Sequence, residues 1–558
     1  MSALRAVVCV PARDEELLIG RCIRALAAQR GIARDAYEVV LVLDGCTDAT
    51  REQATRAAGD LRLHVIERPP LGVGAARRLG MDVACERLMA AGAPDGLVAT
   101  TDADSEVEPG WLAALLEAAE GGARAIGGEV VVEGLDGGVA ARRAERLAAR
   151  LSALPGAAHP HFSGASIAVT AATYRRVGGL EPHAALEDEA FARALDRARV
   201  PIARIAGARV RTSPRPAGRA FRGLARDLAL DAWLDRNAYG RCDLEPAALA
   251  ARKTATVSVV VPAREVARTI GPTVEVLRRF VAAGAVDELL VVDADSADGT
   301  AAVARAAGAT VVQESDLMPA FGPCRGKGDA MWRALAATTG EIVAYVDGDS
   351  EDFGERLLTG LLAPLFARPD LMLVKGAFQR PFASGGEVRP GEGGRVTELM
   401  ARPLLNLHRP ALAGFAQPLA GEMAARRELL EQLAFPVGYG VEIAMLLDAE
   451  ERVGIDALAQ ADLGSRQNRH QPLRELSAMS YAVLVAASRR LLGAAAADAL
   501  APGPYVLPGP AEVDVRQVAV EERPPLSRTR RSPGRSCGPG APTRPSASSE
   551  AAVRTRRA

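Results

Sequence analysis

The sequence lacks the features that would tie it to a membrane, a nucleic acid or an oxidising compartment. Its formal net charge is −1, so no overall field favours nucleic acid or an anionic membrane. Its seven cysteines are scattered without C-x-x-C spacing, which indicates a reducing compartment and argues against disulfides or a zinc site. No uncharged apolar stretch approaches the roughly 20 residues of a spanning helix, and no signal peptide is visible. We therefore expect a cytoplasmic protein without a transmembrane segment or a nucleic-acid partner.

Motif spacing over the 558 residues predicts one α/β fold used twice. Each half opens with a strand ending in Pro-Ala-Arg, "VVCVPAR" and "VSVVVPAR", and continues through a second strand ending in aspartate to an Asp-x-Asp pair. Strands alternating with helices indicate βαβ units, hence an open, mostly parallel sheet with ligands at the carboxyl ends of its strands. We predict domains at 1–234 and 257–500, a linker at 235–256, and a disordered Pro/Arg/Ser-rich tail at 501–558.

Other nucleotide-binding patterns fail on spacing. In "GPCRGKGD" three residues separate Gly322 from Gly326, and a glycine follows Lys327, so the P-loop pattern is not met. Arg77 stands where the Rossmann fingerprint needs its third glycine. A sugar-1-phosphate nucleotidylyltransferase, a further alternative, would need a Gly-rich loop where Pro-Ala-Arg stands. What remains is a diphosphate held by a divalent cation.

The Asp-x-Asp pairs are the candidate cation sites. Asp347 and Asp349 follow the apolar run "EIVAYV", and alternation along a strand places their side chains on one side. Two such carboxylates repel unless a cation lies between them, and Mg²⁺ (or Mn²⁺) takes one or two carboxylates plus substrate phosphates. A polar turn is the alternative for a lone pair, but Asp102 and Asp104 repeat the element. The combination resembles the nucleotide-sugar-dependent glycosyltransferases of the GT-A fold.

The stretch from Thr256 to about Ala486 resembles the glucosyl-3-phosphoglycerate synthase family. The strings "GGRVTEL", "GFAQPLAGE" and "GYGVEI" carry this resemblance and are more specific than an Asp-x-Asp pair. It implies retaining transfer of glucose from UDP-glucose or GDP-glucose to the 2-hydroxyl of 3-phosphoglycerate, giving a precursor of glucosylglycerate. A mannosyl donor is the alternative, because the sequence does not reveal the stereochemistry of the sugar hydroxyls. A homodimer is left open.

The same resemblance assigns site residues. Around the donor it places Pro262, Ala263, Arg264, Ser296, Lys327 and Asp347. At the acceptor it places Gly394, Arg395, Thr397 and Tyr439, and at the reacting sugar Glu442 and the backbone carbonyl of Leu419. To the metal it assigns Asp349 and, where the family has a histidine, Asn468 or His470. A glycine N–H, an arginine fork and a threonine hydroxyl suit a phosphate or carboxylate, although a loop leading into a capped helix is the alternative for that segment.

The resemblance also bears on mechanism. A backbone carbonyl such as that of Leu419 is a poor nucleophile, but its dipole can stabilise a developing oxocarbenium ion. We therefore expect displacement on one face of the sugar, with the leaving diphosphate helping to take the acceptor proton. Glu442 would then orient hydroxyl groups without forming a covalent adduct.

The first half resembles inverting glycosyltransferases of the GT-A fold, of the family-2 type. "ALEDEAFARAL" follows "HFSGASIAVTAATYRRVGGL", and the resemblance makes Asp188 the general base, with Glu187 positioning the acceptor. The alternatives are an acidic first turn favoured by the helix dipole and a non-catalytic interaction module. The segment at 212–223 contains arginines that could line an anionic acceptor or be solvated; the acceptor is not identified. Pro11, Asp44 and Asp102 are expected at the donor and Asp104 at the metal.

Overall fold

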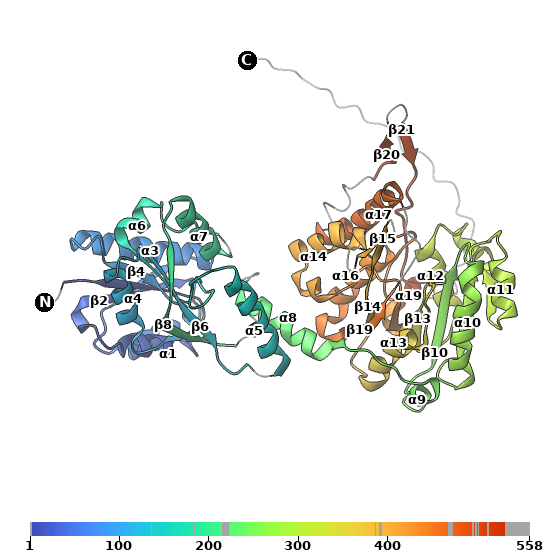
Figure 1. Cartoon of the computed structure of the whole chain (residues 1–558), viewed down its shortest axis with the longest axis horizontal. Helices are drawn as coiled ribbons and strands as arrows, with labels where there is room; N and C mark the ends of the chain where they lie inside the picture. The colour runs from blue at the N-terminus through green and yellow to red at the C-terminus, as the bar shows by residue number, and fades with distance from the viewer. Residues whose placement is uncertain are drawn as a thin grey trace, which may run out of the picture. The chain divides into compact units, whose positions relative to one another are not determined.

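The chain forms two α/β units. The computed structural model describes residues 3–135, 137–183, 185–214, 223–384, 387–389, 393–466, 472–493, 496, 499, 502–509 and 513–529. The first unit comprises Met1–Ala238 and Arg409–Gly414, and the second comprises Tyr239–His408 and Phe415–Ala558. Each unit is built on an eight-stranded sheet with helices on its faces (Figure 1).

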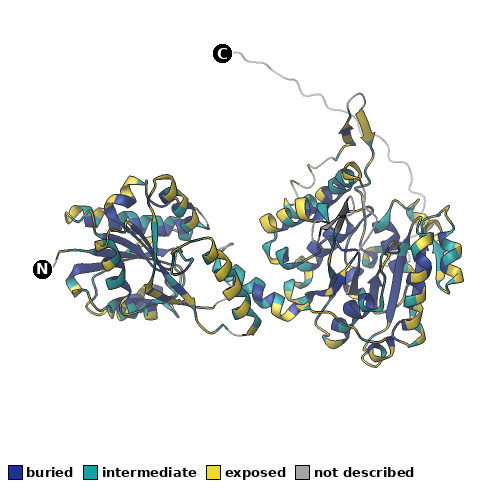
Figure 2. Cartoon of the chain, viewed as in Figure 1, coloured by how far each residue is buried: buried dark blue, intermediate teal, exposed yellow. Residues whose placement is uncertain are grey.

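The sheet of the first unit has the strand order β3-β2-β1-β4-β7-β6-β8-β5. Its strands are β1 (Ala6–Ala12), β2 (Tyr37–Asp44), β3 (Leu63–Arg68), β4 (Leu97–Thr100), β5 (Ser105–Val107), β6 (Ala125–Val132), β7 (Ile167–Thr170) and β8 (Ile202–Thr212). Strand β1 runs parallel to β2 and β4, whereas β7 runs antiparallel to β4 and β6. The central strands are valine-rich and buried along their whole length, as expected for strands covered on both faces (Figure 2).

Helices cover both faces of this sheet. One face packs against α1 (Ile19–Ala27), α2 (Thr50–Ala58) and α4 (Trp111–Glu120). The other packs against α3 (Val73–Ala90), α6 (Ala171–Arg176) and α7 (Glu187–Arg197). Helices α5 (Gly137–Ser152) and α8 (Leu224–Asn237) complete the unit, together with the short turns η1 (Arg34–Ala36) and η5 (Pro410–Gly414).

The sheet of the second unit repeats this plan, with the order β12-β11-β10-β13-β17-β14-β19-β9. Its strands are β9 (Ala238–Tyr239), β10 (Val257–Ala263), β11 (Glu288–Asp293), β12 (Thr310–Gln313), β13 (Ile342–Tyr345), β14 (Leu373–Gln379), β17 (Met423–Arg426) and β19 (Leu458–Ser465). Strand β17 is antiparallel to both of its neighbours, as β7 is in the first unit. Both sheets are therefore mixed, with a parallel half that carries the Pro-Ala-Arg and Asp-x-Asp segments.

Helices again lie on both faces of the second sheet. They are α9 (Pro246–Ala250), α10 (Ala267–Ala282), α11 (Thr300–Ala306), α12 (Lys327–Ala337), α13 (Glu355–Ala367), α14 (Arg402–His408), α15 (Arg427–Leu430), α16 (Val441–Val453), α17 (Leu473–Leu491) and α19 (Leu526–Thr529). Short helical turns are η2 (Glu314–Asp316), η3 (Pro319–Phe321), η4 (Thr397–Ala401) and η6 (Ile455–Ala457). Three two-stranded ribbons pair β15 (Phe382–Ser384) with β16 (Glu387–Arg389), β18 (Phe435–Pro436) with β22 (Glu522–Arg523), and β20 (Tyr505–Pro508) with β21 (Val513–Arg516).

Two predicted boundaries need correction. Most of the predicted linker at 235–256 belongs to the second unit, because β9 joins its sheet and Leu249 on α9 is fully buried in its core. The predicted disordered tail forms β20, β21, β22 and α19 between 505 and 529. Backbone pairing of β22 with β18 explains why that polar stretch is ordered. Residues 530–558 of the predicted tail lie outside the described part of the chain.

The described residues contain no candidate membrane-spanning helix. None of their helices combines the length and the apolar character that crossing a bilayer requires.

Candidate active site

The carboxyl ends of β10 and β11 bring predicted donor residues of the second unit together. Pro262 and Ala263 end β10, and Arg264 follows them. Ser296 lies in the turn after β11, where its Oγ accepts a hydrogen bond of 2.9 Å from the backbone N–H of Glu265. Because β10 and β11 are parallel neighbours, these residues share one edge of the sheet.

Lys327 joins two carboxylates at this edge. Its Nζ lies 2.6 Å from Asp347 Oδ1 and 3.0 Å from Glu442 Oε1. Lys327 begins α12, Asp347 follows β13, and Glu442 lies in the first turn of α16. Burial by itself would lower the pKa of Lys327, but the two carboxylates outweigh burial and raise it. The side chain therefore holds a positive charge where three predicted site elements meet.

The pKa values of Asp347 and Asp349 are shifted in opposite directions. Burial opposes ionisation of Asp347, yet the Lys327 ammonium holds the pKa of that carboxyl below its ordinary value. Surrounding protein atoms, and then the negative charge of Asp347, raise the pKa of Asp349, although the residue is exposed at the surface. A divalent cation would relieve this repulsion, and neighbouring carboxylates are ligands that suit Mg²⁺ and Mn²⁺. The residues present fit such an ion.

The loop at 417–422 packs against the Lys327–Asp347 pair. A Cβ atom on Gly421 would come within 2.6 Å of Asp347 Oδ1 and would also collide with Lys327 Nζ. Only a residue without a side chain allows this approach of the backbone. Leu419, whose carbonyl the family resemblance places at the reacting sugar, lies two residues earlier in the same loop.

A second lysine, Lys375 on β14, contacts the same loop. Its Nζ donates a hydrogen bond of 2.9 Å to the carbonyl oxygen of Ala420, the residue after Leu419. Burial lowers the pKa of Lys375 to about 8, even though the carboxylate of Glu442 acts in the opposite direction. The peptide segment around Leu419 is thus held by a buried amine.

The loop ends in a buried ion pair. Arg466 Nη1 lies 2.6 Å from Glu422 Oε1, and both side chains are almost fully buried. Burial, and then the charge of Asp347, raise the pKa of Glu422. Arg466 lies two residues before Asn468 and four before His470, the predicted metal ligands, which lie outside the described residues.

The predicted acceptor residues approach the start of the loop. Gly394 has a φ of 70°, and a Cβ atom there would lie 3.8 Å from Thr397 Cβ and 3.9 Å from Gln417 Oε1. Arg395 follows Gly394, and the buried Thr397 begins η4. Tyr439 lies apart from this turn, in the segment before α16, and is 49% exposed. The glycine turn and the loop at 417–422 are therefore neighbours.

The first unit builds the same arrangement around Arg77. Its Nη2 lies 2.7 Å from Asp102 Oδ1, and its Nε lies 3.0 Å from Glu187 Oε1. Arg77 lies on α3, Asp102 follows β4, and Glu187 begins α7, which occupy the same places in the chain order as α12, β13 and α16. Burial alone would lower the pKa of Arg77, but Asp102 and Glu187 raise it. Each unit therefore joins an Asp-x-Asp carboxylate to a helix-start glutamate through a cation.

Asp188 follows Glu187 at the start of α7. Its Oδ2 accepts a hydrogen bond of 3.2 Å from the Gly164 N–H, and its Oδ1 accepts one of 2.9 Å from the Glu189 N–H. Burial, and then the charge of Glu187, raise the pKa of Asp188. A raised pKa is the direction that suits a carboxylate acting as a general base.

Pro11 and Asp44 lie at the carboxyl ends of β1 and β2, on the edge predicted to hold the donor. Asp44 is buried, and its two oxygens accept hydrogen bonds of 2.9 Å from the Leu71 N–H and 2.8 Å from the Gly72 N–H. The carboxylate therefore orders the loop that leads into α3. Its contact with the donor stays a prediction.

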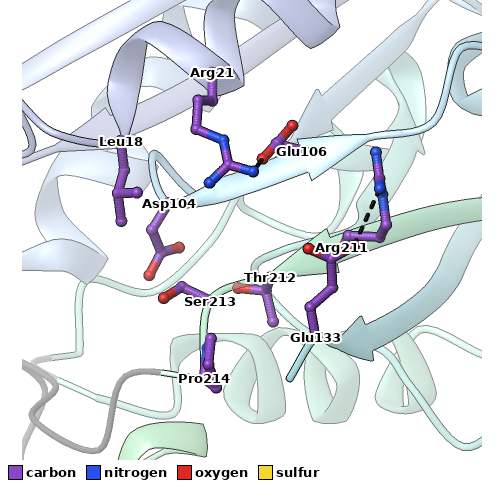
Figure 3. Close-up of a pocket in the computed structure, with 9 residues that line it drawn as sticks. All are labelled: Leu18, Arg21, Asp104, Glu106, Glu133, Arg211, Thr212, Ser213 and Pro214. Carbon is purple, nitrogen blue, oxygen red and sulfur yellow. Dashed lines mark hydrogen bonds and ion pairs between the residues drawn. The ribbon is translucent and has the colours of Figure 1, made fainter. Parts of the chain in front are cut away.

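Asp104, the predicted metal ligand of the first unit, lines a small pocket (Figure 3). The pocket has a volume of about 90 Å³ and is closed on one side by Arg21, which pairs with Glu106 at 2.6 Å. Thr212 and Ser213, at the end of β8, form part of the opposite wall (Figure 3). The Asp-x-Asp turn of this unit therefore opens onto a cavity.

Sequence reasoning missed three of these residues. Arg77 was considered only as a residue that breaks a dinucleotide-binding pattern, although its place on the helix before an Asp-x-Asp strand matches that of Lys327. Lys375 stands within an otherwise apolar strand, which is itself an unusual signal. Gly421 lies within the string "GFAQPLAGE", but its close approach to Lys327 and Asp347 depends on side chains distant in the sequence.

Comparison with known proteins gives the family. The model of glycosyl transferase family 2 matches residues 7–176 and 258–431. A glucosyl-3-phosphoglycerate synthase of Mycolicibacterium smegmatis is 42% identical over 303 residues, which cover 53% of this chain and 98% of that protein. One of Petrotoga mobilis is 39% identical over 237 residues, covering 42% of this chain and 73% of that protein.

Solved structures with similar chains carry related names. A mannosyl-3-phosphoglycerate synthase from Rubrobacter xylanophilus is 43% identical and covers 53% of this chain and 98% of its own, with a TM-score of 0.48. A glucosyl-3-phosphoglycerate synthase from Mycobacterium tuberculosis, in complex with Mn²⁺, UDP-glucose and phosphoglyceric acid, is 37% identical and covers 52% of this chain and 98% of its own, with a TM-score of 0.47. With its family model matching both halves, this chain belongs to glycosyl transferase family 2.

Proposed function

We propose that the second unit is a hexosyltransferase that moves glucose from UDP-glucose or GDP-glucose to the 2-hydroxyl of 3-phosphoglycerate, with retention, in the cytoplasm. The observation that carries this proposal is the Lys327 bridge between Asp347 and Glu442, closed on one side by the backbone of Gly421. It joins a cation suited to a diphosphate to a carboxylate suited to sugar hydroxyls. The curated relatives that share this half are named glucosyl-3-phosphoglycerate synthases.

The donor half of the proposal rests on charge. A nucleoside diphosphate gains negative charge as its bond to the sugar breaks, and a positive group fixed beside it lowers the energy of that state. Lys327 is fixed in this way, since two carboxylates hold its ammonium before any ligand binds. Pro262, Ala263 and Ser296, at the ends of the neighbouring strands, would contact the nucleoside.

The acceptor half rests on the glycine turn. The backbone N–H groups around Gly394, the Arg395 guanidinium and the Thr397 hydroxyl are donors that suit the phosphate and carboxylate of 3-phosphoglycerate. The turn lies beside Gln417, at the start of the loop that carries Leu419. Acceptor and sugar would therefore meet at this loop.

Retention follows from displacement on one face of the sugar. The carbonyl of Leu419 would face the anomeric carbon and stabilise developing positive charge there, while the departing diphosphate accepts the proton of the attacking hydroxyl. Glu442 Oε1 is already paired with Lys327 Nζ at 3.0 Å. This pairing suits a carboxylate that orients hydroxyl groups better than it suits a carboxylate that attacks the sugar as a nucleophile. Mass spectrometry after reaction with donor alone tests this, because a glycosylated Glu442 would contradict it.

Asp349, together with Asn468 or His470, would hold a divalent cation, Mg²⁺ or Mn²⁺. Such an ion would neutralise part of the negative charge of the diphosphate. Lys327 would supply the remaining positive charge on the protein side. Whether the reaction requires the ion is measured by adding and removing chelator during turnover.

The deciding experiment incubates the full chain with 3-phosphoglycerate and a panel of UDP-glucose, GDP-glucose and GDP-mannose, with and without Mg²⁺. Formation of glucosyl-3-phosphoglycerate with the α-configuration of the donor supports the proposal. Transfer from GDP-mannose alone would identify a mannosyl enzyme, and no transfer to this acceptor would refute the assignment. Arg395→Met should weaken acceptor binding. Light scattering on the same sample tests for a homodimer.

We infer that the first unit is a second glycosyltransferase, of the inverting type, with Asp188 as its base. The Arg77 bridge supports a donor site like that of the second unit, and the raised pKa of Asp188 supports a proton-accepting role. Hydrolysis or transfer of nucleotide-sugars by a chain in which Lys327→Met lowers the activity of the second unit measures this activity. Asp188→Asn should abolish it, whereas a non-catalytic module would show no change.

A further inference from the structure

Basic side chains gather on one face of the first sheet, the face that carries α7. Arg204 on β8 lies in register with Gly127 on β6, and paired residues of parallel strands point to the same face. A Cβ atom on Gly127 would come within 2.6 Å of the His161 carbonyl oxygen, so the segment with His161 lies over that glycine. Phe162, the next residue, packs against the core of the same face. Arg204 and the segment that carries His161 therefore lie on the same face of the sheet, next to Gly127.

The His161 ring has an unused donor. Its Nδ1 accepts a hydrogen bond of 3.1 Å from the Val130 N–H, so the neutral ring must carry its proton on Nε2. This Nε2 is buried and has no hydrogen-bond partner among the described residues. The adjacent His159 differs, because its Nε2 lies 3.0 Å from the carbonyl oxygen of Ile205. An N–H donor buried without an acceptor calls for one from outside the chain.

Arg204 differs from the other two arginines of β8, Arg209 and Arg211, because those two form ion pairs. On β8, Arg209 pairs with Glu129 at 2.8 Å and Arg211 pairs with Glu133 at 3.1 Å. Arg204 forms no ion pair with any described residue, and its buried Nε has no hydrogen-bond partner there. Burial lowers the pKa of Arg204 without an opposing carboxylate.

The arginines of helix α5 likewise differ in whether they form ion pairs. Arg142 pairs with Asp235 at 2.8 Å and Arg146 pairs with Asp231, whereas the half-buried Arg143 has no ion-pair partner among the described residues. Burial, and then the charge of Arg146, lower the pKa of Arg143. Burial lowers the pKa of His161 most, and the charges of His159, Arg143 and Arg150 lower it further.

This basic cluster lies close to the proposed base. The Phe162 ring stacks on Phe191 of α7 with centroids 6.2 Å apart, and Gly164 N–H donates to Asp188 Oδ2 at 3.2 Å. Gly164 is three positions after His161 in the chain, which limits the distance between their Cα atoms to about 11 Å. A small acceptor could therefore reach from the cluster to Asp188.

We propose that Arg143, His161 and Arg204 bind a phosphate group on the acceptor of the first unit. All three present N–H donors to a ligand, so the ligand group must supply acceptor oxygens and negative charge. Two guanidinium groups and one imidazole N–H suit the three outer oxygens of a phosphomonoester better than the two of a carboxylate. The inference rests on the proposed transferase activity of the first unit in one respect: that activity makes the bound phosphate compound an acceptor.

The test follows the imidazole of His161 in the full chain by NMR, with ¹³C-labelled histidine and His161→Gln to assign its signal among the six histidines. Inorganic phosphate is the probe. The pKa of His161, about 4 in the free protein, should rise by at least about one unit at saturation, because a nearby phosphate anion favours the imidazolium. Arg204→Met and Arg143→Met should each weaken phosphate binding at least roughly tenfold. Arg209→Met, which removes a paired arginine of the same strand, should not.

Controls separate this site from the second unit. Arg395→Met removes a proposed anion ligand of the second unit and should leave the His161 response unchanged. Glycerol phosphate and vesicles containing phosphatidic acid distinguish a soluble phosphomonoester from a lipid-borne one, and a response to either supports the site. An unchanged His161 signal with every phosphate probe, or an equal response to acetate, would overturn the proposal. Because this readout needs no turnover, its failure is distinct from a failure of the transferase assignment.

Discussion

Lys375 Nζ donates a hydrogen bond of 2.9 Å to the carbonyl oxygen of Ala420, and the lysine is only 1% exposed. A buried amine at this position orients the peptide segment that follows Leu419. Burial lowers the pKa of Lys375 from its ordinary value to about 8. The protonation state of this side chain therefore changes within an accessible pH range.

We predict a pH-dependent stability difference for Lys375→Met. Between about pH 8 and about pH 10 the folded wild type releases this proton while the unfolded chain keeps it, so wild-type stability rises with pH in that interval. The variant lacks this contribution. Its unfolding midpoint relative to wild type should therefore fall as pH rises from about 7 to about 10. Thermal unfolding of both proteins across this range measures the difference. Lys253→Met is the matched control, and a difference independent of pH would contradict the prediction.

Gly421→Ala should abolish most transfer activity of the second unit. The new methyl group would meet Asp347 Oδ1 at 2.6 Å and displace the Lys327 ammonium, so the loop and the ion pair cannot keep their present positions together. Gly354→Ala is the matched control, because a Cβ atom there meets nothing within 4 Å and its φ is −137°. Steady-state kinetics of both variants measure the effect. Equal activity of the two would show that the approach of Gly421 is not needed.

Lys327→Met should lower kcat more than it raises KM for the nucleotide-sugar. Its charge is held for a diphosphate that becomes more negative in the transition state, and loss of such a group costs about 10²-fold in kcat. Lys327→Arg should recover part of the rate, because Arg77 serves the same pair of carboxylates in the first unit. A change in KM alone would assign Lys327 to ground-state binding.

The segment at 519–529, which we call the C-terminal strap, holds the two helices of the second site together. Strand β22 in the strap pairs with β18, six residues before Glu442. Arg523 contacts the fully buried Asp329, two residues after Lys327, at 2.6 Å and 2.9 Å. The strap therefore contacts α12 directly and the segment that leads into α16.

Deletion of residues 519–558 should strongly reduce transfer by the second unit. Deletion of 530–558 is the matched control, since it removes none of these contacts. Arg523→Met leaves Asp329 with the Arg333 guanidinium and the Arg325 N–H and should destabilise the unit by about 2 kcal/mol. Kinetics and thermal unfolding of the three variants measure both effects. Full activity without the strap would show that it does not position the site.

The architecture was predicted from local patterns. Pro-Ala-Arg after an apolar strand and Asp-x-Asp after another recur at similar spacing in both halves, and the prediction of two GT-A-type domains is confirmed. Hydrophobic runs that form buried parallel strands are legible because burial on both faces demands an unbroken apolar sequence. The linker and tail boundaries were wrong because polar composition was taken as a sign of an unpacked chain. Arg523, in the predicted tail, instead contacts the buried Asp329.

The sequence alone determined the two sheets, the edge at which ligands are expected, and the choice of Asp347 and Asp102 as candidate site residues. The tertiary structure decided which cation each carboxylate meets, Lys327 in one unit and Arg77 in the other. It also decided that Gly421 and Lys375 shape one loop. The reason is physical: strand patterns depend on neighbours one or two residues apart, whereas ion pairs and close backbone approaches depend on residues brought together only when the chain folds.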